Sequence, residues 1–283
     1  MTELPFRWDV ARREQLGKLL DGPPADAYPG FLDELRECCV RVVAAAADGD
    51  MVFVGRSPES IFDYVSGALA DTSWAARPVL LNFSMRYDSA DEIRRKNIHA
   101  LRAMLAQLAA VGLSPAAIAA SERPQVFIDL VYAGKTFGRL LGLLEHAAEE
   151  EGVDVAAVRR RIRFLGITER TKNSPNTWRW YQRSEWAARM PRRSLRGVSI
   201  PRWLWTYLGD IQPKVARWNP PMVWGHEMLR EPPRENLPAL RLAYAIHQRA
   251  RDPAERARFA TELAACREIR DPAVRKLVLE LRG

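Results

Sequence analysis

The chain has 283 residues, 47% of them apolar, and a formal net charge of +8, which excludes an intrinsically disordered chain and allows one substantial core with additions. No uninterrupted apolar run reaches the roughly 18–20 residues that span a bilayer, and the N-terminus lacks the basic start and apolar stretch of a signal peptide. We therefore expect a cytoplasmic protein without a membrane partner. Its three cysteines lack the spacing of zinc ligands and are expected to be reduced thiols.

Three segments of the chain differ in hydrophobic pattern. In residues 1–48 the apolar residues recur at helical spacing, which predicts an N-terminal helical segment. Residues 49–202 alternate short apolar runs with helical patterns. This predicts an α/β core, a mainly parallel sheet with helices on both faces, with a helical insertion at about 88–120. Residues 203–283 are expected to form a tryptophan-rich, helical C-terminal extension. The predicted strands are 51–54, 79–83, 125–129, 162–167 and 197–200.

The segment from Val126 to Thr136 predicts a strand, an acid, a tight loop and a helix. A loop at a helix N-terminus presents unpaired N–H groups and a positive dipole end, which suits a phosphate. Gly134 lets the backbone approach an anion closely, and Asp129 ends the strand on the edge where open α/β sheets bind ligands. We therefore expect Gly134→Val to abolish ligand binding while leaving the melting temperature nearly unchanged.

A nucleotide P-loop is the first alternative for this segment, because Gly134-Lys135-Thr136 matches the end of that motif. The P-loop also needs a glycine five residues before Gly134, and Asp129 occupies that position. The P-loop interpretation therefore fails.

The same segment closely resembles the signature of type I phosphoribosyltransferases, in which an apolar strand, two acids and several small or apolar residues precede Gly-Lys/Gly-Thr/Ser. Its ending is most similar to the hypoxanthine-guanine branch. The resemblance implies that family's fold, binding of phosphoribosyl pyrophosphate with Mg²⁺, and transfer of the phosphoribosyl group to an acceptor. It places Asp129 at the ribose hydroxyls, as the one candidate contact for magnesium, and Tyr132 where the acceptor's proton is handled. The 5′-phosphate would be held by Ala133, Gly134, Lys135 and Thr136.

A second match follows the first predicted strand, at Gly55-Arg56-Ser57. In the family this loop cradles the pyrophosphate. Gly55 permits tight backbone geometry, Arg56 can pair with phosphate oxygens, and Ser57 is expected to cap a helix that begins at Pro58. Arg86 follows the second strand, at a sheet edge where this fold often reaches the pyrophosphate.

The chain departs from the family at several positions. Ile128 replaces the first of the two signature acids. The stretch Arg196–Pro201 resembles a late strand of the purine enzymes, but Arg202 stands where an acid follows and Leu195 where an aromatic residue stacks on the base. These departures argue against a standard purine, so the acceptor stays unidentified.

Two other functions remain open. Loss of the first acid fits a non-catalytic sensor of a phosphorylated ribose or nucleotide. An RNA-binding regulator is suggested by residues 151–220, which hold fifteen Arg or Lys against five Asp or Glu. Trp178, Trp180 and Trp186 lie among these arginines and could stack on bases, although we favour a partly buried tryptophan layer.

Overall fold

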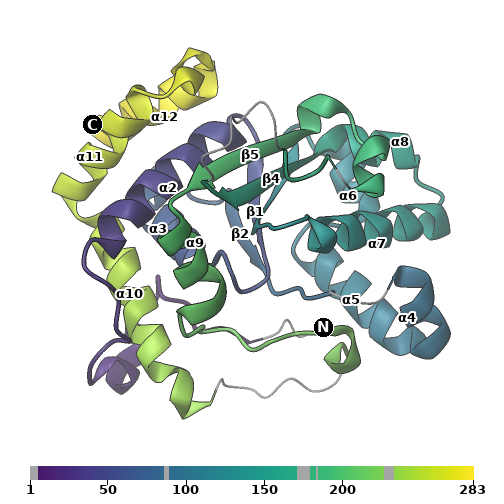
Figure 1. Ribbon diagram of the computed structural model, residues 1–283, viewed down its shortest axis with the longest axis horizontal. Coiled ribbons are helices and arrows are strands. Elements are labelled where there is room, and N and C mark those ends of the chain that lie inside the picture. Colours follow the sequence, from purple (N-terminus) through teal and green to yellow (C-terminus); the bar gives the residue numbers. More distant parts are fainter. Residues whose placement is uncertain (1–5, 86–88, 171–178, 183, 226–232) are drawn as a thin grey trace.

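The computed structural model describes residues 6–85, 89–170, 179–182, 184–225 and 233–283. A central sheet of five parallel strands runs through this part of the chain in the order β2-β1-β3-β4-β5, with helices on both faces (Figure 1). The expectation of an α/β protein with a mainly parallel, doubly covered sheet is confirmed. The strands are β1 Asp50–Val54, β2 Pro78–Leu81, β3 Gln125–Leu130, β4 Ile162–Glu169 and β5 Leu195–Ile200.

The second strand ends at Leu81, two residues earlier than predicted. Leu81 is the last residue of β2 to pair with β1, opposite Val54. Gly55, the residue after β1, has a φ of +79° and donates its N–H to the carbonyl of Leu81 at 2.8 Å, and the ladder of β1 and β2 ends there. The residues after Leu81 therefore leave the sheet and become available to line a site.

The central strands are buried on both sides, which explains why they read as continuous apolar runs. Met51 and Phe53 of β1 face one layer of helices, while Val52 and Val54 face the other. In β3, Ile128 and Phe127 divide in the same way. Successive side chains of a strand point to opposite faces, so the sheet separates two apolar cores.

One core combines helices from both ends of the chain with α3, which spans Glu59–Leu69. Gly67 of α3 lies against His247 of α10, which spans Leu237–Arg251, and a side chain at position 67 would collide with the carbonyl of His247. The N-terminal segment and the C-terminal extension thus pack on the same face of the sheet (Figure 1). The helices of this face are α2 Phe31–Ala46, α3 Glu59–Leu69, α9 Arg202–Thr206, α10 Leu237–Arg251, α11 Pro253–Ala264 and α12 Pro272–Arg282.

The opposite face carries the predicted insertion and the helices that follow β3. The stretch Ile98–Ala120 is long and apolar enough to cross a membrane by length and composition alone. Here a turn at 111–114 divides it into two helices, and Leu101, Met104 and Ile118 pack in the core of this face. The helices are α4 Ala90–Lys96, α5 Ile98–Ala110, α6 Pro115–Ala120, α7 Lys135–Glu151 and α8 Val155–Arg161.

The N-terminal segment is helical only in part. Residues 21–30 form no helix, because three prolines and two glycines with positive φ, Gly22 and Gly30, interrupt the pattern. The prediction of helix is therefore wrong for this stretch. The remaining elements are α1 Arg13–Leu16, a π-helix at Tyr207–Ile211, and the 3₁₀ helices Gly17–Leu20, Glu185–Arg189, Arg192–Ser194, Pro221–Val223, Arg234–Asn236 and Arg267–Arg270.

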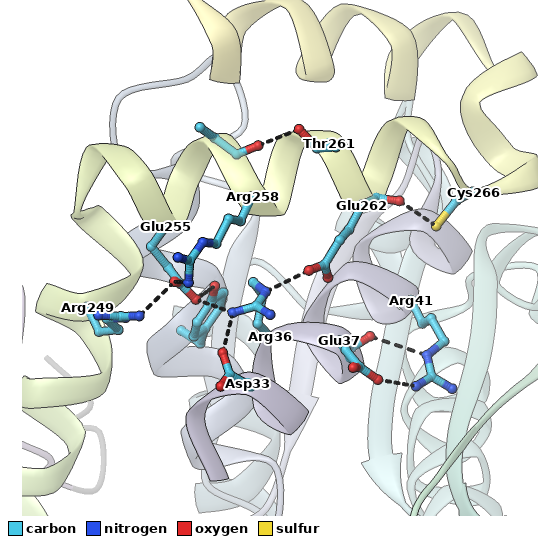
Figure 2. A network of polar contacts seen from close by, with 12 residues as sticks. Asp33, Arg36, Glu37, Arg41, Arg249, Glu255, Arg258, Thr261, Glu262 and Cys266 are labelled. Carbon is cyan, nitrogen blue, oxygen red and sulfur yellow. Dashed lines mark hydrogen bonds and ion pairs between the residues drawn. The ribbon is translucent and has the colours of Figure 1, made fainter. Parts of the chain in front are cut away.

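Ion pairs hold α11 against α2 (Figure 2). Arg36 of α2 donates to Glu255 at 3.0 Å and to Glu262 at 2.8 Å, both on α11, and to Asp33 at 2.7 Å. Glu255 is 1% exposed and also pairs with Arg249 at the end of α10, at 3.2 Å. This cluster fixes the C-terminal helices on the core.

Candidate functional site

A cavity of about 810 Å³ opens at the carboxyl edge of the sheet, beside β1 and β3. These strands are neighbours, but α3, which follows β1, and α7, which follows β3, cover opposite faces. The chain therefore leaves the two strands in opposite directions and opens a crevice, the usual ligand position in such sheets. The cavity is lined by the loops after β1, β2 and β3 and by part of residues 209–219.

The loop after β1 requires glycine at position 55. Gly55 has a φ of +79°, its N–H donates to the carbonyl of Leu81 at 2.8 Å, and an added Cβ would lie 3.0 Å from the carbonyl oxygen of Phe83. Arg56 and Ser57 follow Gly55, and all three residues line the cavity.

The predicted capping role of Ser57 is wrong. Helix α3 begins at Glu59, and the residue before it is Pro58, with no side chain capping the first turn. The N–H of Glu59 donates to the carbonyl of Arg56 at 3.2 Å, so a separate turn precedes the helix and leaves Ser57 outside it.

The loop after β3 ends at Gly134, directly before α7. Gly134 has a φ of +66°, and an added Cβ would lie 2.5 Å from the ring of Trp180. Glycine is thus needed both for the left-handed backbone and for the packing of the indole. This packing argues against the expectation that Gly134→Val leaves the melting temperature nearly unchanged.

The first turn of α7 supplies the predicted anion-binding groups. Lys135 and Thr136 line the cavity, and no side chain caps the N-terminus of this 17-residue helix. The first N–H groups of a helix lack intrahelical partners, so those of α7 remain available to a ligand. The carbonyl of Ala133 turns away from the cavity and accepts a hydrogen bond from Ser184 at 2.8 Å, which anchors the loop.

Asp129 lies on the wall of the cavity, at the end of β3. Its side chain is 7% exposed, and burial raises the pKa of its carboxyl well above the ordinary value, although a backbone hydrogen bond at Leu130 opposes the shift. Its neighbour Ile128 faces the other side of the sheet and is fully buried in the core of α2 and α3. The position of the missing signature acid is therefore a core position here.

Two cations of the cavity, Arg56 and Lys135, have no partner among the described residues. In the part of the chain that the structure describes, the side chains of Arg56 and Lys135 form no hydrogen bond or ion pair. Arg86, the other predicted cation, lies outside the described residues. Tyr132 lines the cavity with a side chain that is 82% exposed.

The sequence analysis missed several residues of the cavity, among them Lys214 and Trp218 of the C-terminal extension. Lys214 is a partly buried cation, and Trp218 is 52% exposed and donates from its indole nitrogen to the hydroxyl of Ser84 at 2.8 Å. No motif marks either residue, because only the folding of the extension brings them beside β1 and β2.

The tryptophans near residue 180 pack against the loop that precedes α7. Trp180 is buried, donates to the carbonyl of Arg196 at 2.9 Å and packs against Gly134 and Gly166. Trp186 lies beside it, with ring centroids 6.0 Å apart. The expected partly buried tryptophan layer is confirmed for these two residues, whereas Trp178 lies outside the described part.

A resident metal centre is not built from the described residues, since no three His, Cys, Asp or Glu side chains gather there. Asp129 is the single acid at the end of the central strands. Mg²⁺ often keeps most of its oxygen ligands from water and substrate phosphates, so one carboxylate fits a magnesium ion that arrives with its ligand.

The arrangement combines the N-terminus of α7, three cations, the buried carboxyl group of Asp129 and the exposed Asp210 around a single cavity. Such a site suits an anionic ligand that also carries hydroxyl groups for the carboxyl. No family model, curated protein or solved structure matches this chain.

Proposed function

We propose that this protein has a type I phosphoribosyltransferase-like fold, binds phosphoribosyl pyrophosphate, and transfers the phosphoribosyl group to an acceptor other than a standard purine. The observation that carries the proposal is the meeting of Gly55–Ser57, Asp129 and Tyr132–Thr136 in one cavity at the edge of a parallel sheet. Gly55–Ser57 lies more than 70 residues before the other two segments, which follow each other at the end of β3. The three segments correspond to the three parts of the ligand.

The 5′-phosphate binds at the N-terminus of α7, against the N–H groups of the first turn and the hydroxyl of Thr136. The pyrophosphate binds the loop Gly55–Ser57, where Arg56 has no partner among the described residues that a ligand would need to displace. Charge-assisted hydrogen bonds of this kind are the stronger class and favour planar guanidinium groups.

The ribose lies between the two phosphate sites, beside Asp129. Breaking the anomeric C–O bond leaves positive charge on the ribose and negative charge on the departing pyrophosphate. Asp129, when ionised, stabilises the first charge, and Arg56 with magnesium stabilises the second. Magnesium travels with the ligand and neutralises part of the pyrophosphate charge.

Calorimetry with phosphoribosyl pyrophosphate, with and without magnesium, tests the binding step. We expect binding that is weakened by a chelator. A pyrophosphate-release assay with candidate acceptors tests the transfer step. Absence of binding in magnesium would overturn the proposal, and equal affinity with chelator would argue for metal-free anion binding.

A sensor of a phosphorylated ribose is the second candidate, and the burial of Asp129 favours it. Burial raises the pKa of the Asp129 carboxyl, which means that it disfavours the charged form that a cationic transition state needs. Tight binding without pyrophosphate release for any acceptor would identify the sensor. Measurable turnover would identify the enzyme.

A further inference from the structure

One wall of the cavity comes from residues 212–219, which we call the strap. The strap follows the π-helix Tyr207–Ile211 and belongs to the C-terminal extension. It is fastened to the first turn of α3, because the buried carboxylate of Glu59 accepts the N–H groups of Val215 at 2.9 Å and Ala216 at 3.1 Å. The hydroxyl of Ser60 adds a bond of 2.9 Å to the side-chain oxygen of Gln212.

Lys214 lies at the centre of this junction. Its ammonium group donates to the carbonyl of Leu208 at 2.6 Å, to the side-chain oxygen of Gln212 at 3.1 Å and to the carbonyl of Ser57 at 3.4 Å. A lysine has three N–H donors, so these oxygens engage all of them. One ammonium group thus ties the π-helix, the strap and the loop after β1 together.

The contact with Ser57 orients the loop that is proposed to bind pyrophosphate. A carbonyl oxygen that faced an anion would repel it, whereas this oxygen is turned to a cation. Arg56, the adjacent residue, keeps its guanidinium group free of partners in the described part of the chain. The positive charge of Lys214 also adds to that of Arg56 at the same wall of the cavity.

We infer that Lys214 is a positioning residue of the anion site: through Ser57 it holds the loop Gly55–Ser57 in its binding conformation, and its charge raises the affinity of the cavity for a pyrophosphate group. This inference rests on the proposed function of the loop. It also gives the C-terminal extension a role, since the strap completes a site whose other parts follow β1 and β3.

Three carboxylates and a second cation surround Lys214. Glu59 and Asp63 face it from α3, Asp210 from the π-helix and Arg56 from the loop after β1. Asp63 is paired with Arg7, through two bonds of 2.7 Å. Glu59 accepts two backbone N–H groups of the strap and keeps its charge, so Glu59 and Asp210 favour the charged form of Lys214.

Lys214 therefore confers a pH dependence on anion binding. Burial lowers the pKa of Lys214 to about 8. The lysine is charged below that value and becomes neutral as the pH rises through it. An anion that prefers the charged form will lose affinity over the same interval, and its binding at alkaline pH will be accompanied by proton uptake.

The test uses the full chain and inorganic pyrophosphate with magnesium as the probe. Calorimetry is done at about pH 7 and about pH 9.5, which lie on either side of the pKa of about 8 for Lys214. Lys214→Met removes the charge. Lys214→Arg keeps it, because the guanidinium group stays protonated at both pH values. Lys276→Met is the control, because Lys276 is an exposed lysine on α12 whose contact is Glu280.

We expect Lys214→Met to weaken binding by about 10- to 100-fold at the lower pH, which corresponds to about 1.4–2.8 kcal/mol. The wild-type protein should lose more affinity between the two pH values than Lys214→Arg does, because only the lysine loses its charge. The ionisation of the probe contributes equally to both proteins and cancels in the comparison. Lys276→Met should bind as the wild type does.

Three results would overturn the inference. Equal affinity of Lys214→Met and the wild type would exclude the role of Lys214 while leaving the proposed function intact. An equal pH dependence in Lys214→Arg and the wild type would assign the titration to another group. Absence of pyrophosphate and phosphoribosyl pyrophosphate binding in the wild type would overturn the proposed function itself. If Lys214→Met does not fold, the comparison of Lys214→Arg with the wild type still decides the question.

Discussion

Charged residues are used in opposite ways in two regions of this molecule. In the cluster around Glu255, each carboxylate and guanidinium group that joins α2 to α11 has an oppositely charged neighbour (Figure 2). In the cavity at the carboxyl edge of the sheet, Arg56 and Lys135 have no such neighbour in the described residues, and Asp129 is buried without a cation. The first region serves the stability of the fold, whereas the second keeps its charges for a ligand.

The contrast has an energetic meaning. Removing one partner of a buried ion pair leaves an uncompensated charge and destabilises a protein by about 3–5 kcal/mol. A binding site that holds unpaired charges lowers stability in the absence of its ligand, so substitutions there often stabilise a protein while they remove its function. Substitutions in the two regions should therefore have opposite effects on stability and on binding.

The largest effect on stability is expected for Glu255→Ala. The substitution leaves the hydroxyl of Tyr64, which donates to Glu255 at 2.9 Å, without its partner and removes one of three carboxylates from Arg36. We expect the free energy of unfolding in urea to fall by about 3–5 kcal/mol, with pyrophosphate affinity unchanged. Arg160→Met is the control, because Arg160 pairs with Asp154 on the surface, and such pairs contribute about 0–1 kcal/mol. A similar loss in both variants would contradict the special role of the cluster.

Gly134→Val is expected to damage both stability and binding. Its new side chain would collide with Trp180 and the backbone would have to keep a φ of +66°. Overpacking and left-handed strain together predict a loss of about 2–5 kcal/mol, measured by urea unfolding. Gly112→Ala is the matched control, because Gly112 has a φ of +77° with open space around it and should show the strain alone. A valine variant as stable as the alanine control would show that Trp180 yields easily.

Asp129→Asn is expected to separate function from stability. It keeps the shape of the side chain and removes its charge, so pyrophosphate release should fall by about 10- to 1000-fold, corresponding to ~1.4–4 kcal/mol, with ligand binding weakened less. An unchanged rate would show that the carboxylate has no catalytic role. Loss of binding by the variant, in a protein whose wild type shows no turnover, would identify a sensor.

The pH dependence of stability provides a second measurement on the same variant. Burial raises the pKa of Asp129 in the folded state above the unfolded value of about 3.9. The folded state then holds its proton more tightly, so the wild type loses stability relative to Asp129→Asn as the pH rises from about 4 toward neutrality. A difference in unfolding free energy that is constant over this interval would contradict the burial of an ionisable carboxyl.

The smallest effect in free energy is expected for Arg56→Met. Loss of one charge-assisted contact to pyrophosphate predicts a fall in affinity of about 10- to 100-fold in calorimetry. Stability should stay the same or increase slightly, because the substitution relieves the repulsion that Arg56 exerts on Lys214. Affinity equal to that of the wild type would place the pyrophosphate elsewhere.

The strands and the two glycine loops were accessible from local patterns. Short apolar runs alternating with helical periodicity predicted β1 to β4, and β5 was expected only as a strand-like stretch at 197–200. The glycines at 55 and 134 mark the two turns that border the cavity. The sequence alone could not show that Ser57 does not cap α3. The turn before α3 depends on a backbone hydrogen bond from Glu59 to Arg56, which no sequence pattern marks. Lys214 and Trp218 were missed because their contacts span more than a hundred residues of sequence.

By itself the sequence determined the parallel α/β character of the protein, the edge at which its ligand should bind, and Asp129 as the acid of that edge. These follow from side-chain periodicity and from glycines, which act over a few residues. Only the tertiary structure decided that Ile128 belongs to the core, that Gly134 packs against Trp180, and that Lys214 of the strap lines the cavity. Those features depend on burial and on contacts between distant segments, which no local pattern encodes.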